Sequence, residues 1–443
     1  DPRADGRVAL YDTSDDGFAG SAPLGPLPDL VKFTPDGNTV MVANEGEPAS
    51  DYTDDPEGSV SVVDVSNGAG NASSATAGFG NFDAQSLRED GVRIFGPGAS
   101  AAEDLEPESV VAAPDSQTAY VTLQENNAVG KIDISDTSNP EITDIFPLGY
   151  KDFSKPGNEL DAVNDGQVDI RNEPLFGMYQ PDVIETYEVG GETYIVAANE
   201  GDAREYDALF ETGILTDTGG GDFRIVIDDD GESDTGDVDV DESAFSDGVL
   251  SRLDGLEVTA RPPSFGEGDV SDPGPVSELY LFGGRSYLIL DSDGQQVFES
   301  GDQFEQIVRN SDDVPNDIGF NADDNENGID EESPAAGPEP EGVAIGEIDG
   351  EVFAFIGFEE VGGVAMFDVT DPETPSFVDY SNTRDFDIDP ETAIEDEGEP
   401  ASVAGDLAPE GLTFVPATDS PSGDPLLIVG YEVSGTTAVY SIA

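Results

Sequence analysis

The clearest pattern along the chain is a recurring group of short apolar segments separated by polar turns. In the first copy, three such segments cover residues 28–33, 40–45 and 60–65, and a Pro-Asp-Gly turn at 35–37 separates the first two. Short apolar and β-branched runs bounded by Pro, Asp and Gly are typical of strands. No segment keeps a convincing 3.6-residue apolar period. The pattern therefore predicts antiparallel strands.

Four further copies repeat this order along the chain. Each begins with Pro followed by an acidic residue, and its next apolar segment ends in Glu. The first copy begins at Pro28, and the others begin at Pro107, Pro181, Pro340 and Pro409. A weaker unit at 278–294 looks like a degenerate blade that lacks the terminal Glu. Units of a few short strands favour radial repetition, so we predict an all-β fold, a β-propeller of about six to seven blades with acidic loop insertions.

The repeats run through most of the sequence, so we predict a single β-propeller domain over residues 1–443. Two long excursions, at 201–276 and 383–406, interrupt the repeats, and we expect them to be surface insertions. Strand-like segments at 7–27 and 408–443 are expected to close the ring with one another, which would remove exposed strand edges. Edges left open would instead recruit strands from a neighbouring chain.

The charge balance narrows the environment in which such a chain can fold. The chain has 98 Asp and Glu residues against 16 Lys and Arg residues, a formal net charge of −82. Only a high concentration of salt screens repulsion of this size, so we predict a salt-adapted protein from a halophilic archaeon. Because 36% of the residues are hydrophobic and 23 are Phe, the chain can form a core and is not expected to be disordered. The charge disfavours nucleic acid and anionic lipid as partners and favours cations.

Absent residue types exclude several kinds of site. The chain has no His and no Cys, which excludes a Ser-His-Asp triad, histidine-bound or thiolate-bound metals and disulfides. It contains no run of about 18 apolar residues, so we expect no membrane span in this chain. Because it begins at Asp1 rather than Met, we expect a leader to have been removed and the protein to be extracellular or at the cell surface. Asn71 begins an Asn-Ala-Ser sequon, a candidate glycosylation site.

The repeats also place acidic residues in a fixed phase with the strands. An acid follows the initial Pro, and a Glu ends the next strand, and these two ends are neighbours in an antiparallel hairpin. We therefore expect the carboxylates to crowd one rim near the axis, where they would gain protons or bind hard cations, Ca²⁺ or alternatively Mg²⁺. The alternative is that a salt-adapted chain carries acids everywhere. The candidate ligands are Asp29, Glu45, Glu108, Glu125, Asp182, Glu200, Glu341, Glu359, Glu410 and Glu432.

A second candidate cation site is the acidic loop at 323–332, which contains the D-x-N-x-N-G spacing of calcium loops. Pro334 stands where an EF-hand has its bidentate Glu, so Glu331 or Glu332 would have to replace that ligand. The alternative is a solvated acidic loop. A weaker Asp/Asn/Gly turn at 160–169 is by default a solvated turn. The candidate ligands in the stronger loop are Asp323, Asn325, Asn327, Asp330 and Glu331.

Basic residues are scarce, and four arginines stand next to repeat motifs: Arg171, Arg204, Arg285 and Arg384. A guanidinium that faces a bound metal would hold a phosphate or carboxylate group. We therefore take Arg204 and Arg285 as candidate anion-binding residues. The alternative, which is the commoner case, is that each arginine pairs with an adjacent acid.

Several short phrases occur in an order that resembles the choice-of-anchor I family, which is similar to mesenchyme-specific cell-surface glycoproteins linked to biomineralisation. The resemblance implies a secreted or surface-anchored β-propeller. Some members are described as alkaline-phosphatase-like or phytase-like, but the resemblance carries over no catalytic residue. The phrases are NEGEP at 44–48, LQENN at 123–127, GMYQPD at 177–182, ANEGDAREY at 198–206, GGRS at 283–286, GPEPEGV at 337–343 and EVSGTT at 432–437.

Two functions follow from these observations. The first is an extracellular calcium-binding cell-surface β-propeller with a structural, assembly or binding role at high salt, whose partners are calcium ions and either copies of itself or other cell-surface components. The alternative is a calcium-dependent phosphoesterase of the alkaline phosphatase or phytase type, in which metal ions polarise phosphate while Arg204 or Arg285 clamps it. The sequence leans toward the non-catalytic function, which needs only the carboxylate rim, the calcium loop and the strand-like segments at the two ends.

Overall fold

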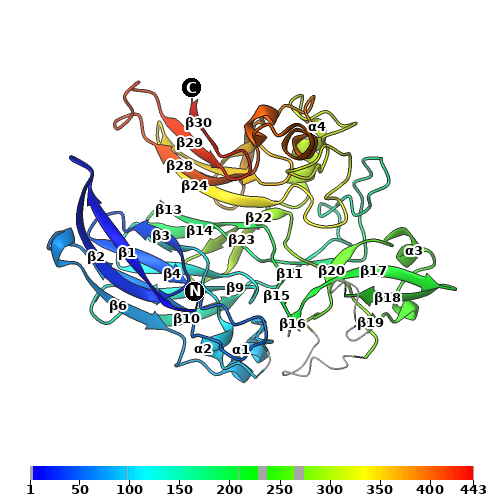
Figure 1. The fold of residues 1–443 in the computed structure, drawn as a ribbon, viewed down its shortest axis with the longest axis horizontal. Helices are drawn as coiled ribbons and strands as arrows, with labels where there is room; N and C mark the ends of the chain where they lie inside the picture. Colours follow the sequence, from blue (N-terminus) through cyan, green and yellow to red (C-terminus); the bar gives the residue numbers. More distant parts are fainter. Residues whose placement is uncertain (1–2, 97, 208, 228–236, 264–273, 443) are drawn as a thin grey trace.

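Antiparallel sheets follow one another along the chain and lie side by side around a common centre in the computed structural model (Figure 1). The structure describes residues 3–96, 98–207, 209–227, 237–263 and 274–442. The first strands of successive sheets contact one another in the order β3, β7, β13, β24 and β28. These strands therefore surround the axis, which confirms the predicted all-β propeller. The number of six to seven blades stays a prediction.

Five sheets form these successive blades, and each begins at its innermost strand. The first holds β3 (Pro28–Phe33), β4 (Thr39–Asn44), β5 (Ser59–Asp64) and β6 (Ser73–Gly78). The second holds β7 (Val110–Ala112), β8 (Thr118–Leu123), β9 (Ala128–Asp133) and β10 (Glu141–Pro147). The fourth holds β24 (Pro340–Ile348), β25 (Glu351–Phe358), β26 (Val364–Asp368) and β27 (Ser376–Ser381), and the fifth holds β28 (Pro409–Val415), β29 (Leu426–Tyr431) and β30 (Thr436–Ser441).

The third blade is assembled from two distant parts of the chain. Its inner strands are β13 (Ile184–Val189) and β14 (Glu192–Asn199), and its outer strands are β22 (Ser286–Asp291) and β23 (Gln296–Glu299). The expectation that 278–294 forms a separate degenerate blade is therefore wrong, because β22 pairs with β14 from Asn199 opposite Ser286 to Tyr194 opposite Asp291. The apolar pattern predicted β22 and β23 as strands, but it did not predict that they pair with the strands of the third blade.

The predicted insertion at 201–276 lies between β14 and β22 and has a sheet of its own. Positions 208, 228–236 and 264–273 of this segment lie outside the described residues. Its core joins a neighbouring small sheet of β11 (Tyr150–Asp152), β12 (Phe176–Met178) and β21 (Tyr280–Leu281). The insertion holds β15 (Glu205–Tyr206), β16 (Leu209–Phe210), β17 (Thr212–Gly219), β18 (Asp222–Val226), β19 (Val238–Asp239), η2 (Glu242–Ala244), α3 (Val249–Arg252) and β20 (Glu257–Thr259).

Helices are few and short among the described residues. None of them is long and apolar enough to cross a membrane. The predicted insertion at 383–406 contains η3 (Thr392–Glu397) and η4 (Ala401–Ala404). The remaining helices are η1 (Ala69–Asn71), α1 (Ala84–Asp90), α2 (Ala101–Asp104) and α4 (Gln303–Asn310).

Two sheets at the ends of the described chain have free edges. β1 (Asp5–Asp12) pairs with β2 (Gly17–Pro26), and within the described residues neither pairs with β28, β29 or β30. Tyr11, Phe18 and Val439 are exposed on these sheets. The predicted closure of the ring between 7–27 and 408–443 stays a prediction, as do the single domain and the surface character of the insertions.

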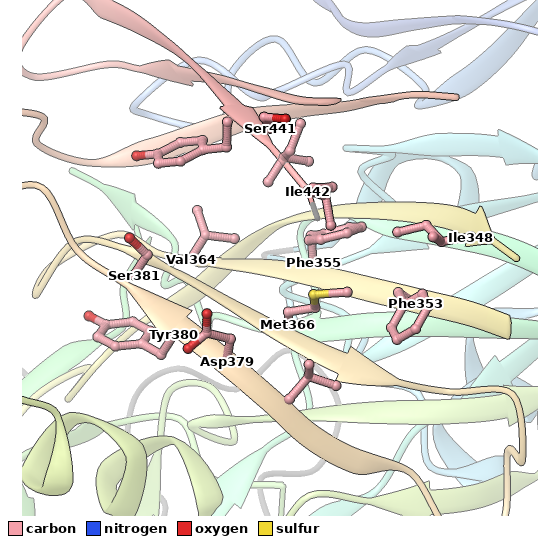
Figure 2. A pocket seen from close by; sticks show the side chains of 13 residues that line it. Ile348, Phe353, Phe355, Val364, Met366, Asp379, Tyr380, Ser381, Ser441 and Ile442 are labelled. Carbon is pink, nitrogen blue, oxygen red and sulfur yellow. The ribbon is translucent and has the colours of Figure 1, made fainter. Parts of the chain in front are cut away.

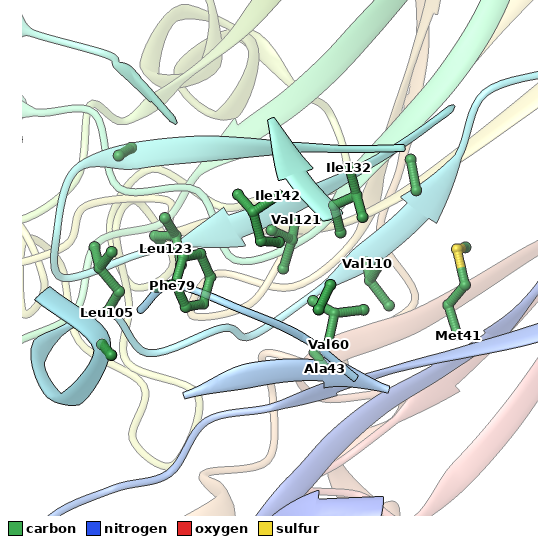
Figure 3. Packing of buried hydrophobic residues seen from close by; sticks show 14 of the residues in the cluster. Met41, Ala43, Val60, Phe79, Leu105, Val110, Val121, Leu123, Ile132 and Ile142 are labelled. Atoms are coloured by element: carbon green, nitrogen blue, oxygen red, sulfur yellow. The ribbon is translucent and has the colours of Figure 1, made fainter. Parts of the chain in front are cut away.

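The core lies between neighbouring blades rather than in one central mass. Figure 3 shows Met41 and Val60 of the first blade facing Val110 and Val121 of the second, with Phe79 packed beside them. All five side chains are buried. Burying each large apolar side chain contributes roughly 1.5–3 kcal/mol, so the apolar faces hold the blades together while the axis remains polar.

Candidate cation-binding channel

The start of the innermost strand has the same irregular geometry in three blades. In the first blade, Pro28 lies opposite Asn44 but Val31 lies opposite Val42, which leaves one extra residue on β3. The same shift follows Pro340 in the fourth blade and Pro409 in the fifth. Such a β-bulge re-aims side chains locally, and the acidic residue after each Pro falls within it.

A strained residue precedes the bulge in the same three blades. Leu27, Glu339 and Ala408 have φ angles of 45°, 51° and 58°, in the left-handed region that costs a non-glycine residue about 1 kcal/mol or more. A backbone hydrogen bond compensates for this cost in each blade and fixes the Glu that ends the second strand. The amide of Glu45 donates to Leu27 at 3.0 Å, that of Glu359 donates to Glu339 at 2.7 Å, and that of Glu432 donates to Ala408 at 2.8 Å.

Residues from all five blades line a cavity of about 460 Å³ at the axis, here called the channel, and four of the blades contribute acidic residues to it. Lys32 of β3 also lines it and pairs with Glu185 of β13, so it supplies a positive charge at the cavity. The other lining residues include apolar side chains of the innermost strands. The acidic lining residues are Asp29, Glu108, Asp182, Glu200 and Glu410.

The carboxylates converge in groups of three. Among the described residues, four groups each offer oxygen atoms that all lie within 4.8 Å of one another. One group joins the first and second blades, two join the third and fourth blades, and one joins the acidic loop to the end of β25. The groups are Asp29, Glu45 and Glu108; Asp182, Glu200 and Glu341; Glu200, Glu339 and Glu359; and Asp323, Glu332 and Glu360.

Burial and mutual repulsion disfavour the ionised form of these groups. Burial, followed by the charge of Asp29, raises the pKa of Glu45 to about 9. Burial, followed by the charge of Glu359, raises the pKa of Glu341 to about 10. Burial, with neighbouring carboxylates, also raises the pKa values of Asp182 and Glu359 to about 7. Without cations, the channel would therefore hold protons at neutral pH.

Glu341 also has an unmet hydrogen-bonding requirement. It is only 7% exposed, and its Oε2 atom has no hydrogen-bond partner among the described residues. A buried, unpartnered carboxylate oxygen is costly, because it has lost water without gaining a donor. Since Glu341 lies in a group with Asp182 and Glu200, a cation at that point would satisfy it.

Three of the predicted rim ligands join no such group with the other residues that the structure describes. Glu125 is buried, with an unpartnered Oε2 atom, and burial is the first cause that raises its pKa to about 7. Glu410 and Glu432 of the fifth blade are exposed. The fifth blade therefore contributes to the cavity through Glu410 without completing a three-carboxylate group.

In the predicted calcium loop at 323–332, the predicted ligand side chains bind other protein groups. The side-chain amide of Asn327 donates to the carbonyl oxygens of Phe386 and Ile388, and its oxygen accepts from Arg384. These contacts occupy Asn327, so the geometry favours Asp323 with Glu332 and Glu360 over the predicted set. Calcium binding by this loop stays a prediction.

The other predicted loop ligands also have protein partners. Asn325 donates to Asp324, Asp330 accepts from the amide of Gln167, and Glu331 accepts from Asn164. In the weaker turn at 160–169, both oxygens of Asp161 accept backbone amides.

Sequence reasoning missed Glu339 and Glu360 as members of carboxylate groups. Glu339 stands two positions before the predicted ligand Glu341, and Glu360 directly follows the predicted ligand Glu359. The fourth repeat carries a second acidic residue near each predicted ligand, and this feature of the sequence could have identified both residues. The positive φ of Glu339, which turns the chain at this point, is not visible in the sequence.

The two candidate anion-binding arginines donate to protein acceptors. Arg204 is fully buried; it donates to the side chain of Asp104 at 3.0 Å and to its carbonyl oxygen at 2.7 Å, and it pairs with Glu106 at 3.2 Å. Arg285 is also buried, and it donates to Glu305 at 2.9 Å and to three carbonyl oxygens. This arrangement favours the alternative that they pair with acids.

Two remaining features lie away from the channel. Asn71 is exposed at the end of η1, so its glycosylation stays a prediction. An apolar cavity of about 470 Å³ lies between the fourth and fifth blades, where Phe353, Met366 and Ile442 line it (Figure 2). It offers no cluster of carboxylates and is not a candidate cation site.

A family model matches most of the chain. Residues 1–372 match the choice-of-anchor I domain. The mesenchyme-specific cell surface glycoprotein of Strongylocentrotus purpuratus is 26% identical over 251 residues, which cover 51% of this chain and 30% of that protein. Gigasin-3a of Magallana gigas is 27% identical over 186 residues, 40% of this chain and 61% of that protein. The matched regions thus span about a third and about three fifths of these curated relatives.

The solved structures that resemble this chain have low TM-scores. The periplasmic gluconolactonase PpgL of Pseudomonas aeruginosa has a TM-score of 0.39 and 12% identity, covering 99% of this chain and 73% of that one. The β-propeller domain of Cps50 (Swd1) from Myceliophteria thermophila has a TM-score of 0.33 and 9% identity, covering 99% and 91%. TM-scores this low support no inference about activity.

Proposed function

The chain belongs to the choice-of-anchor I family, and from this premise we propose that it is an extracellular, cell-surface β-propeller whose central channel binds calcium ions. The bound ions join neighbouring blades, and the protein has a structural, assembly or binding role in a high-salt environment. Magnesium is the alternative ion. The partners proposed are calcium and either copies of the protein or other surface components.

One observation carries the proposal of cation binding: Asp182, Glu200 and Glu341 converge within 4.8 Å from two blades, and Glu341 keeps a buried, unpartnered oxygen. Dispersed acids on a solvated surface would not leave such an atom without a donor. Carboxylate oxygen is the ligand type that Ca²⁺ and Mg²⁺ prefer, and the chain offers neither imidazole nor thiolate.

The position of the groups supports a structural role for the ions. Asp29 and Glu45 come from the first blade and Glu108 precedes the second, so an ion held among them would contact both. Without an ion, these carboxylates hold protons at neutral pH and repel one another where they ionise, and high salt screens buried groups only weakly. Calcium binding would convert this repulsion into a link between blades.

A location at the cell surface rests on the family and on the relatives. The matched protein of Strongylocentrotus purpuratus is named as a cell surface glycoprotein, and the matched family is the choice-of-anchor I domain. The overall charge of −82 fits a high-salt exterior, where counterions are abundant.

Calorimetric titration of the chelated protein in molar NaCl tests the proposal. Addition of Ca²⁺ should give saturable heat and raise the Tm, and Glu341→Gln should reduce both. Glu351→Gln, an exposed change in the same blade, is the matched control and should leave both unchanged. Absence of saturable binding and of any calcium-dependent change in Tm would overturn the proposal. Release of phosphate from model esters, lost in Glu341→Gln, would instead support the phosphoesterase alternative.

A further inference from the structure

Two of the carboxylate groups in the channel share one residue. Glu200, which follows β14 in the third blade, offers oxygens to the group with Asp182 and Glu341 and also to the group with Glu339 and Glu359. A carboxylate has two oxygen atoms, so it can contact a different cation with each. The two groups therefore lie close enough to be joined through Glu200.

The backbone holds the members of both groups in place. Glu339 has a positive φ, and its carbonyl oxygen accepts from the amide of Glu359 at 2.7 Å. Glu341 lies two residues further, within the bulge at the start of β24. The fourth blade thus presents three carboxylates to the third blade, and Glu200 is the third-blade residue that both groups share.

An independent observation points to a ligand at this place. Within the part of the chain that the structure describes, the Oε2 atom of Glu341 has no hydrogen-bond partner, and the residue is more than nine-tenths buried. Its carboxylate belongs to the group with Asp182 and Glu200. When these carboxylates are ionised, an unpartnered buried acceptor among them calls for a cation, because ionised carboxylates offer no donor.

We propose that Asp182, Glu200, Glu339, Glu341 and Glu359 form a centre for two divalent cations in which Glu200 is the bridging ligand. This inference rests on the proposed calcium-binding function and specifies its site. Five ionised carboxylates carry five negative charges, so one divalent ion leaves three uncompensated and two ions leave one. Two ions therefore match the charge of the centre better than one.

The group of Asp29, Glu45 and Glu108 provides an internal comparison. It shares no member with another group, so it is expected to hold a single ion. Replacement of Glu45 should therefore remove one bound ion, whereas replacement of Glu200 should remove two.

Equilibrium dialysis with radiolabelled calcium in molar NaCl measures that number. Glu200→Gln should bind two fewer ions per chain than the unaltered protein, whereas Glu45→Gln, Asp182→Asn and Glu339→Gln should each bind one fewer. A loss of only one ion in Glu200→Gln overturns the bridge but leaves calcium binding intact. If the unaltered protein binds no calcium, the proposed function fails as well.

A second measurement uses the unaltered protein, so it does not depend on the folding of a variant. The chelated protein is loaded with terbium alone or with an equal mixture of terbium and neodymium. If two ions share Glu200, energy transfer over their short separation quenches much of the terbium emission in the mixed sample. Equal emission lifetimes in the two samples would overturn the two-ion centre.

Discussion

The amide of Glu359 donates to the carbonyl oxygen of Glu339, and these two residues also belong to the same group of carboxylates. The hydrogen bond closes the bulge between the first two strands of the fourth blade. It therefore fixes the spacing of two acidic side chains that would otherwise move apart to relieve repulsion. The rigid backbone, rather than the side chains, maintains the crowded carboxylates.

Replacement of Glu341 by Gln should have opposite effects in the absence and presence of calcium. In chelated protein, the change replaces one carboxyl oxygen with an NH2 group that can donate to the neighbouring carboxyl oxygens, so we expect stability to rise by about 1 kcal/mol. With calcium, the variant loses a ligand, so the gain in Tm on calcium addition should fall by at least half. Thermal unfolding followed by circular dichroism, with Glu351→Gln as control, measures both effects. Equal calcium-induced shifts in the two variants would contradict this prediction.

The stability of the chelated protein should decrease as the pH rises. The folded-state pKa values of Glu45, Glu341 and Glu360, at about 9, 10 and 9, exceed the value of about 4.3 for an unfolded Glu. The folded state therefore binds more protons than the unfolded state between about pH 4 and pH 10, and its stability is lost across that range. Saturating calcium should flatten the dependence. Tm values measured across this range, with chelator or with calcium, test it; a Tm that rises with pH in chelator would contradict it.

Arg204→Met should destabilise the protein by about 3–5 kcal/mol, because it leaves the buried side chains of Asp104 and Glu106 without their positive partner. Arg224→Met is the matched control: Arg224 is about half exposed and pairs with exposed Asp239. Its effect should be at most about 1 kcal/mol. Urea unfolding of both variants in molar NaCl gives the two values. Similar losses in both would show that Arg204 is not a structural residue.

Two glycines at the same position of the repeat should respond differently to Ala. A Cβ atom at Gly342 would lie 2.1 Å from the carbonyl oxygen of Glu410, whereas at Gly411 it would meet nothing within 4 Å. Gly342→Ala should therefore force the fourth and fifth blades apart and cost about 1–3 kcal/mol. Gly411→Ala should change stability by less than about 1 kcal/mol. Urea unfolding compares the two, and equal losses would contradict the close approach of these blades.

The repeat pattern predicted the strands and the phase of the acids well, because both depend on local alternation and turn residues. It did not predict that 286–299 completes the third blade, because strand pairing across an insertion leaves no local signal. It also missed Glu339 and Glu360, since their proximity depends on a bulge and on contacts between blades. Arg204 and Arg285 were placed near the repeats, but the acceptors that surround them come from distant segments.

The paired residues Asn199 and Ser286 of the third blade are 87 positions apart, which has a consequence for the folding pathway. Closing so long a loop costs roughly 2–3 kcal/mol more in chain entropy than closing a short hairpin. The insertion shares one apolar cluster with residues 153–175 and 279–281, so prior folding of that cluster would bring the two ends together. We therefore expect the third blade to form late, and slow refolding is the natural result of its high contact order.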